Sequence, residues 1–135
     1  MAASITALRA ETARIGVVRV DEVTHDAHAD VSVVVAWEGR EHVGEAQGPP
    51  ASAARPLLVA TATLHALVAV TDHAVGFRAV DAGVVESGDL DIAIVVVDES
   101  GEPRTGSAVI VSGNLQIAVA RATMDAINRR LQLPE

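Results

Sequence analysis

The sequence predicts an α+β fold in which one βββα unit occurs twice, in the order βββαβββα. Each half of the chain has three β-branched segments followed by an apolar segment with helical spacing. Two stretches of eight residues, one in each half, match at an offset of 60 residues. Only 1% of the residues are aromatic, so neither half alone buries a convincing core. We therefore expect the halves to pack about a pseudo-twofold axis, as an antiparallel sheet with both helices packed on one side.

The internal repeat is clearest in the two helical segments. Residues 60–67 align with residues 120–127, with four identities in eight positions. The same offset also matches Leu57 with Ile117, Val20 with Val80, Asp21 with Asp81, and Gly16 with Gly76. At an offset of 61 or 62, residues 31–35 match residues 92–96, and Gly44 matches Gly106. The change of offset places small insertions or deletions in the turns.

Three strands are expected at the start of each half. Residues 15–23 and 75–86 mix β-branched and polar residues, which is typical of a strand with one exposed face. Residues 31–37 and 92–97 are β-branched runs too short for typical helices and are predicted to be the most buried strands, and residues 42–47 and 105–111 form the third strands. The turns before the third strands, at residues 38–40 and 98–103, contain a glycine where a positive φ is expected.

A helix is expected to close each half. The second helix has an apolar stripe at Ile117, Ala120, Met124, Ile127 and Leu131. The first helix repeats this stripe with Leu57, Ala60, Leu64 and Leu67. Pro56 fits only the first turn of a helix, and either Ser112 or Asn114 can cap the second helix. Alanines at positions 60, 62, 66, 120, 122 and 126 allow close approach of the helix backbones.

The chain of 135 residues fits one domain. We expect residues 1–13 to be an N-terminal extension and residues 14–135 to be a single module. Its two units span about residues 14–73 and 74–131.

Composition excludes several classes of function. The formal net charge of −8 argues against nucleic-acid and anionic membrane partners. The chain has no cysteine, which removes disulfides and Cys-ligated metals, and no lysine to serve a Walker loop. No uninterrupted apolar stretch approaches the roughly 18 to 20 residues of a membrane span, and residues 1–12 lack the layout of a secretory signal. A cytoplasmic location is therefore expected.

Candidate catalytic and metal-binding groups have simpler interpretations. The run His25, Asp26, His28 and Asp30 offers ligands for a divalent ion, but a solvated hairpin loop has the same composition and is the favoured interpretation. Asp21 and Asp81 could form a carboxylate pair, and Thr61, Thr63 and His65 share a helix without an orienting third group. We predict no catalytic residue, no metal ligand and no cofactor.

Short motifs in the chain resemble a known regulatory domain. Residues 113–118 (GNLQIA), residues 126–130 (AINRR) and residues 44–49 (GEAQGP) resemble the C-terminal regulatory domain of 2-isopropylmalate synthase and citramalate synthase. The resemblance covers roughly residues 14–131, and that family also has two βββα units. The chain departs from the family at the helix starts, where Asn114 and Ala51 or Ser52 replace aspartate. A chain of this length also has no room for the catalytic barrel of those synthases.

The resemblance implies a freestanding, non-enzymatic module that forms a homodimer and binds a small carboxylate-bearing effector, such as an amino acid, between the units. Two helix N-termini brought together by a pseudo-twofold axis also present free N–H groups and positive dipole ends to such an anion. The candidate ligand-binding residues at these helix starts are Gly48, Pro49, Ser52, Arg55, Gly113 and Asn114.

Two alternative functions are also consistent with the sequence. The chain could be a protein-interaction or scaffold domain that has lost the ligand, which the missing helix-start aspartates favour. It could also be a small hydrolase or isomerase that uses Asp and His, which the absence of any catalytic motif disfavours.

Overall fold

The computed structural model describes residues 15–71 and 74–131 and confirms the duplicated βββα order. The first unit consists of β1 (Gly16–Thr24), β2 (Ala29–Trp37), β3 (Arg40–Gly48), a short 3-10 helix η1 (Ser52–Ala54) and α2 (Arg55–Val70). The second unit consists of β4 (Phe77–Ser87), β5 (Leu90–Glu99), β6 (Glu102–Val109) and α3 (Leu115–Leu131). The predicted N-terminal extension, residues 1–13, lies outside the described residues.

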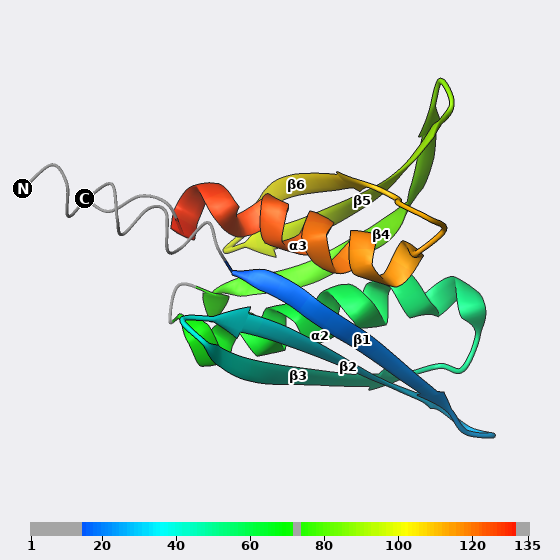
Figure 1. The fold of residues 1–135 in the computed structure, drawn as a ribbon, viewed down its shortest axis with the longest axis horizontal. Helices are drawn as coiled ribbons and strands as arrows, with labels where there is room; N and C mark the ends of the chain where they lie inside the picture. The colour runs from blue at the N-terminus through cyan, green and yellow to red at the C-terminus, as the bar shows by residue number, and fades with distance from the viewer. Residues whose placement is uncertain (1–14, 72–73, 132–135) are drawn as a thin grey trace, which may run out of the picture.

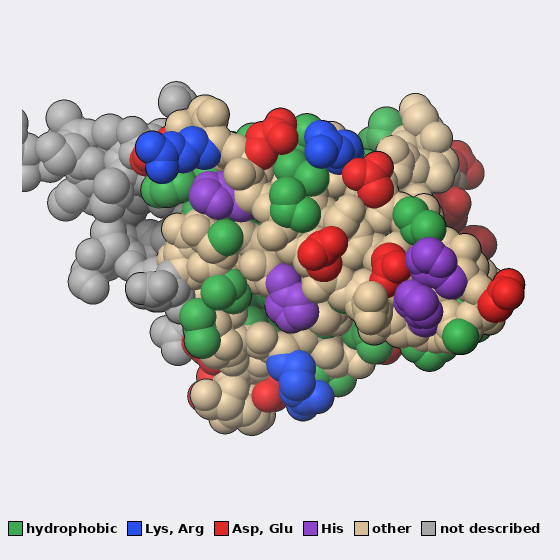
Figure 2. All heavy atoms as spheres, turned by 90° about the horizontal axis from the view of Figure 1, so that it is seen from below, with side chains coloured by type: hydrophobic (Ala, Val, Ile, Leu, Met, Phe, Trp, Pro, Cys, Tyr) green, Lys and Arg blue, Asp and Glu red, His purple; other side chains and the backbone are tan. Residues whose placement is uncertain are grey.

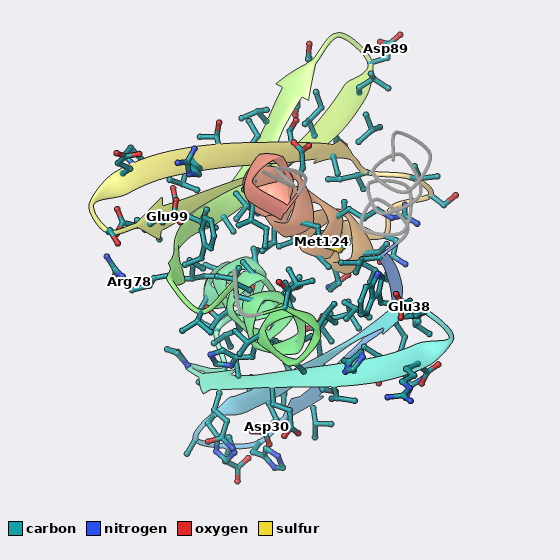
Figure 3. All side chains as sticks on the ribbon, turned by 90° about the vertical axis from the view of Figure 1, so that its left-hand side faces the viewer. Asp30, Glu38, Arg78, Asp89, Glu99 and Met124 are labelled. Carbon is teal, nitrogen blue, oxygen red and sulfur yellow. The ribbon has the colours of Figure 1, made fainter. Side chains whose placement is uncertain are left out.

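The strands form two separate antiparallel sheets, with orders β1-β2-β3 and β4-β5-β6. Each helix packs against two strands of its own sheet, and the two helices contact each other. The helices lie side by side between the sheets, so each sheet has a helix-covered face and an outer face (Figures 1 and 3). Each sheet therefore has its helix on one face only, as predicted. The single sheet that the sequence predicts is divided into two sheets of three strands.

The two units use the same type of turn between their second and third strands. The loop between β2 and β3 is Glu38-Gly39, with φ of 52° and 74°, and the loop between β5 and β6 is Ser100-Gly101, with φ of 53° and 88°. Two consecutive positive φ angles define a type I′ turn, whose twist matches that of the flanking strands. The predicted glycines with positive φ are confirmed in both turns.

The offset between the units is 62 residues in the strands and 60 in the helices. Val33 pairs with Gly44 in the first sheet, and Val95 pairs with Gly106 in the second. The connection from the third strand to the helix is two residues shorter in the second unit, which accounts for the change.

The strand register shows that Asp21 and Asp81 do not occupy equivalent positions in the two units. Arg19 pairs with Val34 and Asp81 pairs with Val96, so the register makes Asp81 the counterpart of Arg19. The predicted equivalence of Asp21 and Asp81 is therefore wrong.

Each helix approaches its sheet so closely that the third strand needs a glycine at the contact. A Cβ atom at Gly44 would lie 2.0 Å from the carbonyl oxygen of Ala62 and 2.2 Å from the backbone nitrogen of Ala66. A Cβ atom at Gly106 would lie 2.1 Å from the carbonyl oxygen of Ala122. These neighbours are backbone atoms, which cannot rotate away as a side chain can. The same strand-to-helix contact therefore occurs in both units.

The core is built mainly of valine and alanine, and α2 is buried on most of its sides. Two threonines are fully buried in it because each hydroxyl donates a hydrogen bond within its own helix. Thr63 Oγ1 donates to the Val59 carbonyl at 2.7 Å, and Thr123 Oγ1 donates to the Val119 carbonyl at 2.8 Å.

The predicted apolar stripe of the first helix needs one correction. Leu57 is 36% exposed, whereas Leu58 is 9% exposed and packs over Gly48. Leu58 therefore takes the buried place in the first turn that the repeat had assigned to Leu57.

One helix in the described part of the chain is long and apolar enough to span a membrane, by length and composition alone. It covers Ser52–Val70, with a mean hydropathy of 1.5. In the structure 44% of that window is buried, and α2 packs against β2, β3, β4 and α3. Its apolar character is accounted for by its central position in the fold.

Replacing Gly106 with alanine should destabilise the protein. The added methyl group meets helix backbone atoms, so we expect the free energy of unfolding to fall by at least about 1–3 kcal/mol, measured by urea denaturation. Gly83→Ala is the matched control, because a Cβ atom at Gly83 has no neighbour within 4 Å and its φ is not in the left-handed region. It should change stability by no more than about 0.5 kcal/mol. Equal losses in both variants would contradict the close contact.

Candidate functional site

A pocket lies where the two helices begin, at the seam between the units. We call it the seam pocket. Its volume is about 200 Å³, and its lining is Glu22, Ser52, Arg55, Pro56, Val59, Leu115, Gln116 and Val119. The first unit supplies the first five of these residues and the second unit supplies the rest. The seam pocket is therefore shared between the units, and neither unit forms it alone.

The start of α2 leaves polar backbone groups without a side-chain cap. Its N-cap residue, Ala54, has no side chain that can accept a hydrogen bond from the first turn. Pro56 lies in the first turn, where the fixed φ of proline suits a helix and its missing N–H is not needed. The 3-10 helix η1 leads directly into α2, and the Arg55 N–H donates to the Ser52 carbonyl. The positive end of the α2 dipole therefore lies beside the seam pocket without a side-chain acceptor of its own.

The start of α3 is capped as the sequence predicts. The Ile117 N–H donates to Asn114 Oδ1 at 3.2 Å, so Asn114 is the capping residue. The chain turns into the helix through Ser112 and Gly113, with φ of 54° and 70°. Leu115 and Gln116, in the first turn of α3, then complete the seam pocket.

Arg55 is the main charged group of the seam pocket. Its Nη1 forms an ion pair with Glu22 on β1. Its Nη2 donates to Thr24 Oγ1 and to the Pro50 carbonyl, both at 3.1 Å. The side chains of Arg55 and Glu22 are only 16% and 19% exposed. The Arg55 Nε is buried and has no hydrogen-bond partner among the described residues.

The rest of the lining is mostly apolar. Pro56 and Val59 come from α2, while Leu115 and Val119 come from α3. A ring of apolar groups next to a fixed pair of opposite charges suits a small ligand with a charged end and an apolar end.

The structure brings some of the predicted site residues together in the seam pocket and places the others outside it. Ser52 and Arg55 line the seam pocket. Asn114 lines a neighbouring, more open depression that also includes Glu22 and Gln116. Gly48 lies under the Leu58 side chain, so it serves packing.

Pro49 is exposed and Gly113 forms the turn before α3, and neither lines the seam pocket. Glu22 was not predicted. It lies 33 positions before Arg55, and nothing in the local sequence indicates that the two side chains meet.

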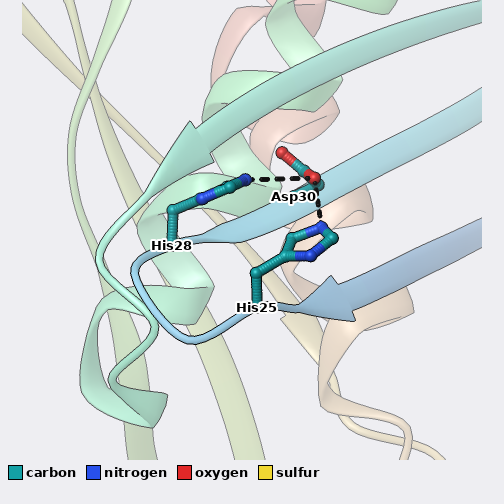
Figure 4. A group of neighbouring side chains, drawn as sticks. All are labelled: His25, His28 and Asp30. Carbon is teal, nitrogen blue, oxygen red and sulfur yellow. Dashed lines mark hydrogen bonds and ion pairs between the residues drawn. The ribbon is translucent and has the colours of Figure 1, made fainter.

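A second group of polar side chains lies at the hairpin between β1 and β2. His25, His28 and Asp30, which we call the hairpin cluster, have ligand atoms that all lie within 4.8 Å of one another. His25 Nε2 is 2.9 Å and His28 Nε2 is 3.5 Å from the same oxygen, Asp30 Oδ2 (Figure 4). The two imidazole rings are stacked, with centroids 4.5 Å apart. The fourth member of the predicted run, Asp26, is exposed and lies outside this group.

The carboxyl of Asp30 is held in its charged form. Burial raises its pKa, but hydrogen bonds from His25 and Gln47 and the nearby charges of His28 and His25 have a larger opposite effect. The pKa of Asp30 therefore lies below its ordinary value. Figure 2 shows histidine and acidic side chains on the face of the molecule seen from below, with arginine and apolar side chains between them.

The candidate hydroxyl and imidazole groups of α2 have separate partners. Thr61 Oγ1 donates to the Leu57 carbonyl at 2.9 Å, while His65 Nδ1 lies 2.6 Å from the Glu45 carbonyl oxygen. Thr63 is buried and donates to its own helix. Each of the three side chains therefore contacts a different backbone carbonyl, and the three do not form a catalytic arrangement.

Comparison of the chain with models of known protein families and with curated proteins gives no match. The resemblance to the synthase regulatory domain therefore stays a prediction, supported by its short motifs.

Replacing Glu22 with glutamine should reduce stability, because it leaves the Arg55 guanidinium largely buried without its countercharge. We expect a loss of about 1–3 kcal/mol in the free energy of unfolding, measured by urea denaturation. Asp21→Asn is the matched control, since Asp21 is next along β1 and pairs with Arg19 where both side chains are more than half exposed. That change should cost less than about 1 kcal/mol. A cost for Glu22→Gln no larger than for Asp21→Asn would show that the seam ion pair is not structural.

Proposed function

We propose that the chain is a non-enzymatic, dimerising module that binds a small carboxylate-bearing effector, an α-amino acid with an apolar side chain, in the seam pocket. The observation that carries this proposal is the pairing of Arg55 with Glu22 beside apolar walls from both helix starts.

The two charges suit the two ends of an α-amino acid. The ligand carboxylate would be held by the Arg55 guanidinium, whose Nε has no partner, together with the positive dipole end of α2. An unpaired buried donor is costly, so a ligand oxygen that reaches it recovers that cost. The ligand ammonium would be held by the Glu22 carboxylate. The ligand side chain would then lie against Val59 and Val119.

The size of the seam pocket limits the effector. Its volume of about 200 Å³ is below the roughly 300–1,000 Å³ typical of pockets for larger ligands. A single amino acid or keto acid is therefore favoured over a nucleotide or a sugar.

The lining of the seam pocket supports binding without catalysis. Among the described residues, no histidine lines the seam pocket. Its one hydroxyl group belongs to Ser52, in the 3-10 helix directly before α2. A nucleophile needs a base within hydrogen-bond reach, and the acidic residue of this lining, Glu22, pairs with Arg55 rather than with the Ser52 hydroxyl.

A second candidate function is protein interaction without a ligand. It is favoured by the far end of the β4–β5 hairpin, which projects from the body of the molecule (Figure 1) and exposes Val85 and Leu90 on one face and Val84 on the other. Exposed apolar residues gathered on one projection are typical of a contact surface. Under the first proposal this surface would serve the dimer.

A chain that is monomeric at high micromolar concentration by light scattering would contradict the dimer.

Amino-acid binding should be visible as a rise in melting temperature, because a ligand that binds only the folded state stabilises it by mass action. At about 100 times its dissociation constant, the effector should add about 2.7 kcal/mol, or several degrees. The screen compares leucine, isoleucine and valine with their 2-keto acids, which lack the ammonium group. The amino acids should give the larger shift.

Glu22→Gln should remove the preference for the amino acid over its keto acid, because it removes the group that pairs with the ammonium. The readout is the shift caused by each ligand within one variant, so a change in basal stability does not affect the comparison. Asp21→Asn should keep the preference. If no amino acid or keto acid shifts the wild-type protein and another protein binds it, the interaction function replaces the effector function.

A further inference from the structure

We propose that the hairpin cluster of His25, His28 and Asp30 binds a divalent transition-metal ion, with Zn²⁺ as the best fit. This site lies at the β1–β2 hairpin, is formed by the first unit alone, and does not depend on the function of the seam pocket.

The geometry of the hairpin cluster is close to that of a zinc site. Zn²⁺ holds imidazole nitrogen and carboxylate oxygen at about 2.0–2.2 Å, so neighbouring ligand atoms of a tetrahedral site lie about 3.3–3.6 Å apart. In the protein, the Asp30 oxygen lies 2.9 Å from His25 Nε2 and 3.5 Å from His28 Nε2, and no pair of ligand atoms exceeds 4.8 Å. The three ligand atoms therefore already lie near the spacing that a tetrahedral ion requires.

The backbone holds the two imidazoles on the same side of the hairpin. The His25 N–H donates to the His28 carbonyl at 2.7 Å and closes the four-residue loop between β1 and β2. Asp30 follows on β2 and points toward both rings (Figure 4). One ring nitrogen of each histidine is thereby directed at the same carboxylate oxygen before any ion binds.

The donor set favours zinc over the common hard cations. Two imidazoles and one carboxylate are ligands for Zn²⁺ and related transition metals, whereas Mg²⁺ prefers oxygen donors. Three protein ligands leave one position of a tetrahedral ion for water. Asp30 Oδ1 is buried with no hydrogen-bond partner among the described residues. The carboxylate therefore has a free oxygen as well as the one shared by the imidazoles.

The internal repeat shows that the fold does not require these three residues. At the strand offset of 62, His25, His28 and Asp30 correspond to Ser87, Leu90 and Ile92 in the second unit. That hairpin closes with the pair Ser87 and Leu90 and the turn Gly88-Asp89, and it contains no imidazole. A hairpin of this unit therefore forms without the cluster. Ligation explains the three polar groups better than a need of the fold does.

Titration of the metal-free, tag-free full chain with Zn²⁺ tests the proposal, with calorimetry for stoichiometry and NMR for the imidazole nitrogens. We expect one Zn²⁺ per chain, shifts of the His25 and His28 ring signals, and no response to Mg²⁺ at the same concentration. His28→Gln and Asp30→Asn should each weaken binding at least about tenfold. His42→Gln is the control, because His42 lies on β3 outside the cluster, and it should bind as the wild type does.

The variants change residues on a solvent-facing hairpin, and circular dichroism verifies that each one is folded. The proposal fails if Zn²⁺ in large excess gives no heat and no imidazole shift. It also fails if His42→Gln weakens binding as much as His28→Gln does. In the first case the three side chains only stabilise the hairpin through their contacts with one another. His28→Gln would then lower the melting temperature by the same amount with and without zinc.

Discussion

The fold depends on a close contact between the backbone of a helix and a glycine of a strand, and this contact occurs once in each unit. Gly44 and Gly106 lie against the backbones of α2 and α3, where no Cβ atom fits. A core of valine and alanine has few large side chains to fill space, so its packing density depends on such direct approach. The contact fixes each helix at the same place on its sheet. The two helices also begin at the same end of the molecule (Figure 1), and their first turns share the seam pocket.

The two units agree in packing and differ in charge. Glu22 corresponds to Val84 at the strand offset, and Arg55 corresponds to Leu115 at the helix offset. The ion pair of the seam pocket therefore has no counterpart in the second unit, which contributes apolar wall instead. The hairpin cluster is also confined to the first unit. A nearly symmetric scaffold thus carries an asymmetric site, which suits a ligand whose two ends differ.

The repeat made the fold predictable, because matched glycines and helical stripes in the two halves each pointed to the same unit. It failed where the offset changed between strands and helices, as the pairing of Asp21 with Asp81 shows. Ser52 and Arg55 were predicted because a helix start is visible in the sequence. Glu22 was not, because its contact with Arg55 depends on how a distant strand lies beside that helix. The hairpin cluster is visible in the sequence only as a polar loop, since composition cannot distinguish a solvated turn from three side chains directed at one point.

The central claim is that the starts of α2 and α3 meet across the seam of two like units. Because the chain has no cysteine, the variant with Ser52→Cys and Gln116→Cys can be treated with a short bifunctional maleimide and analysed by peptide mapping. We predict an efficient cross-link within one chain. The control pair, Ser52→Cys with Asp125→Cys, places the second thiol about 14 Å further along α3 and should cross-link poorly. Equal yields for the two pairs, or a link found only between chains, would contradict the shared pocket.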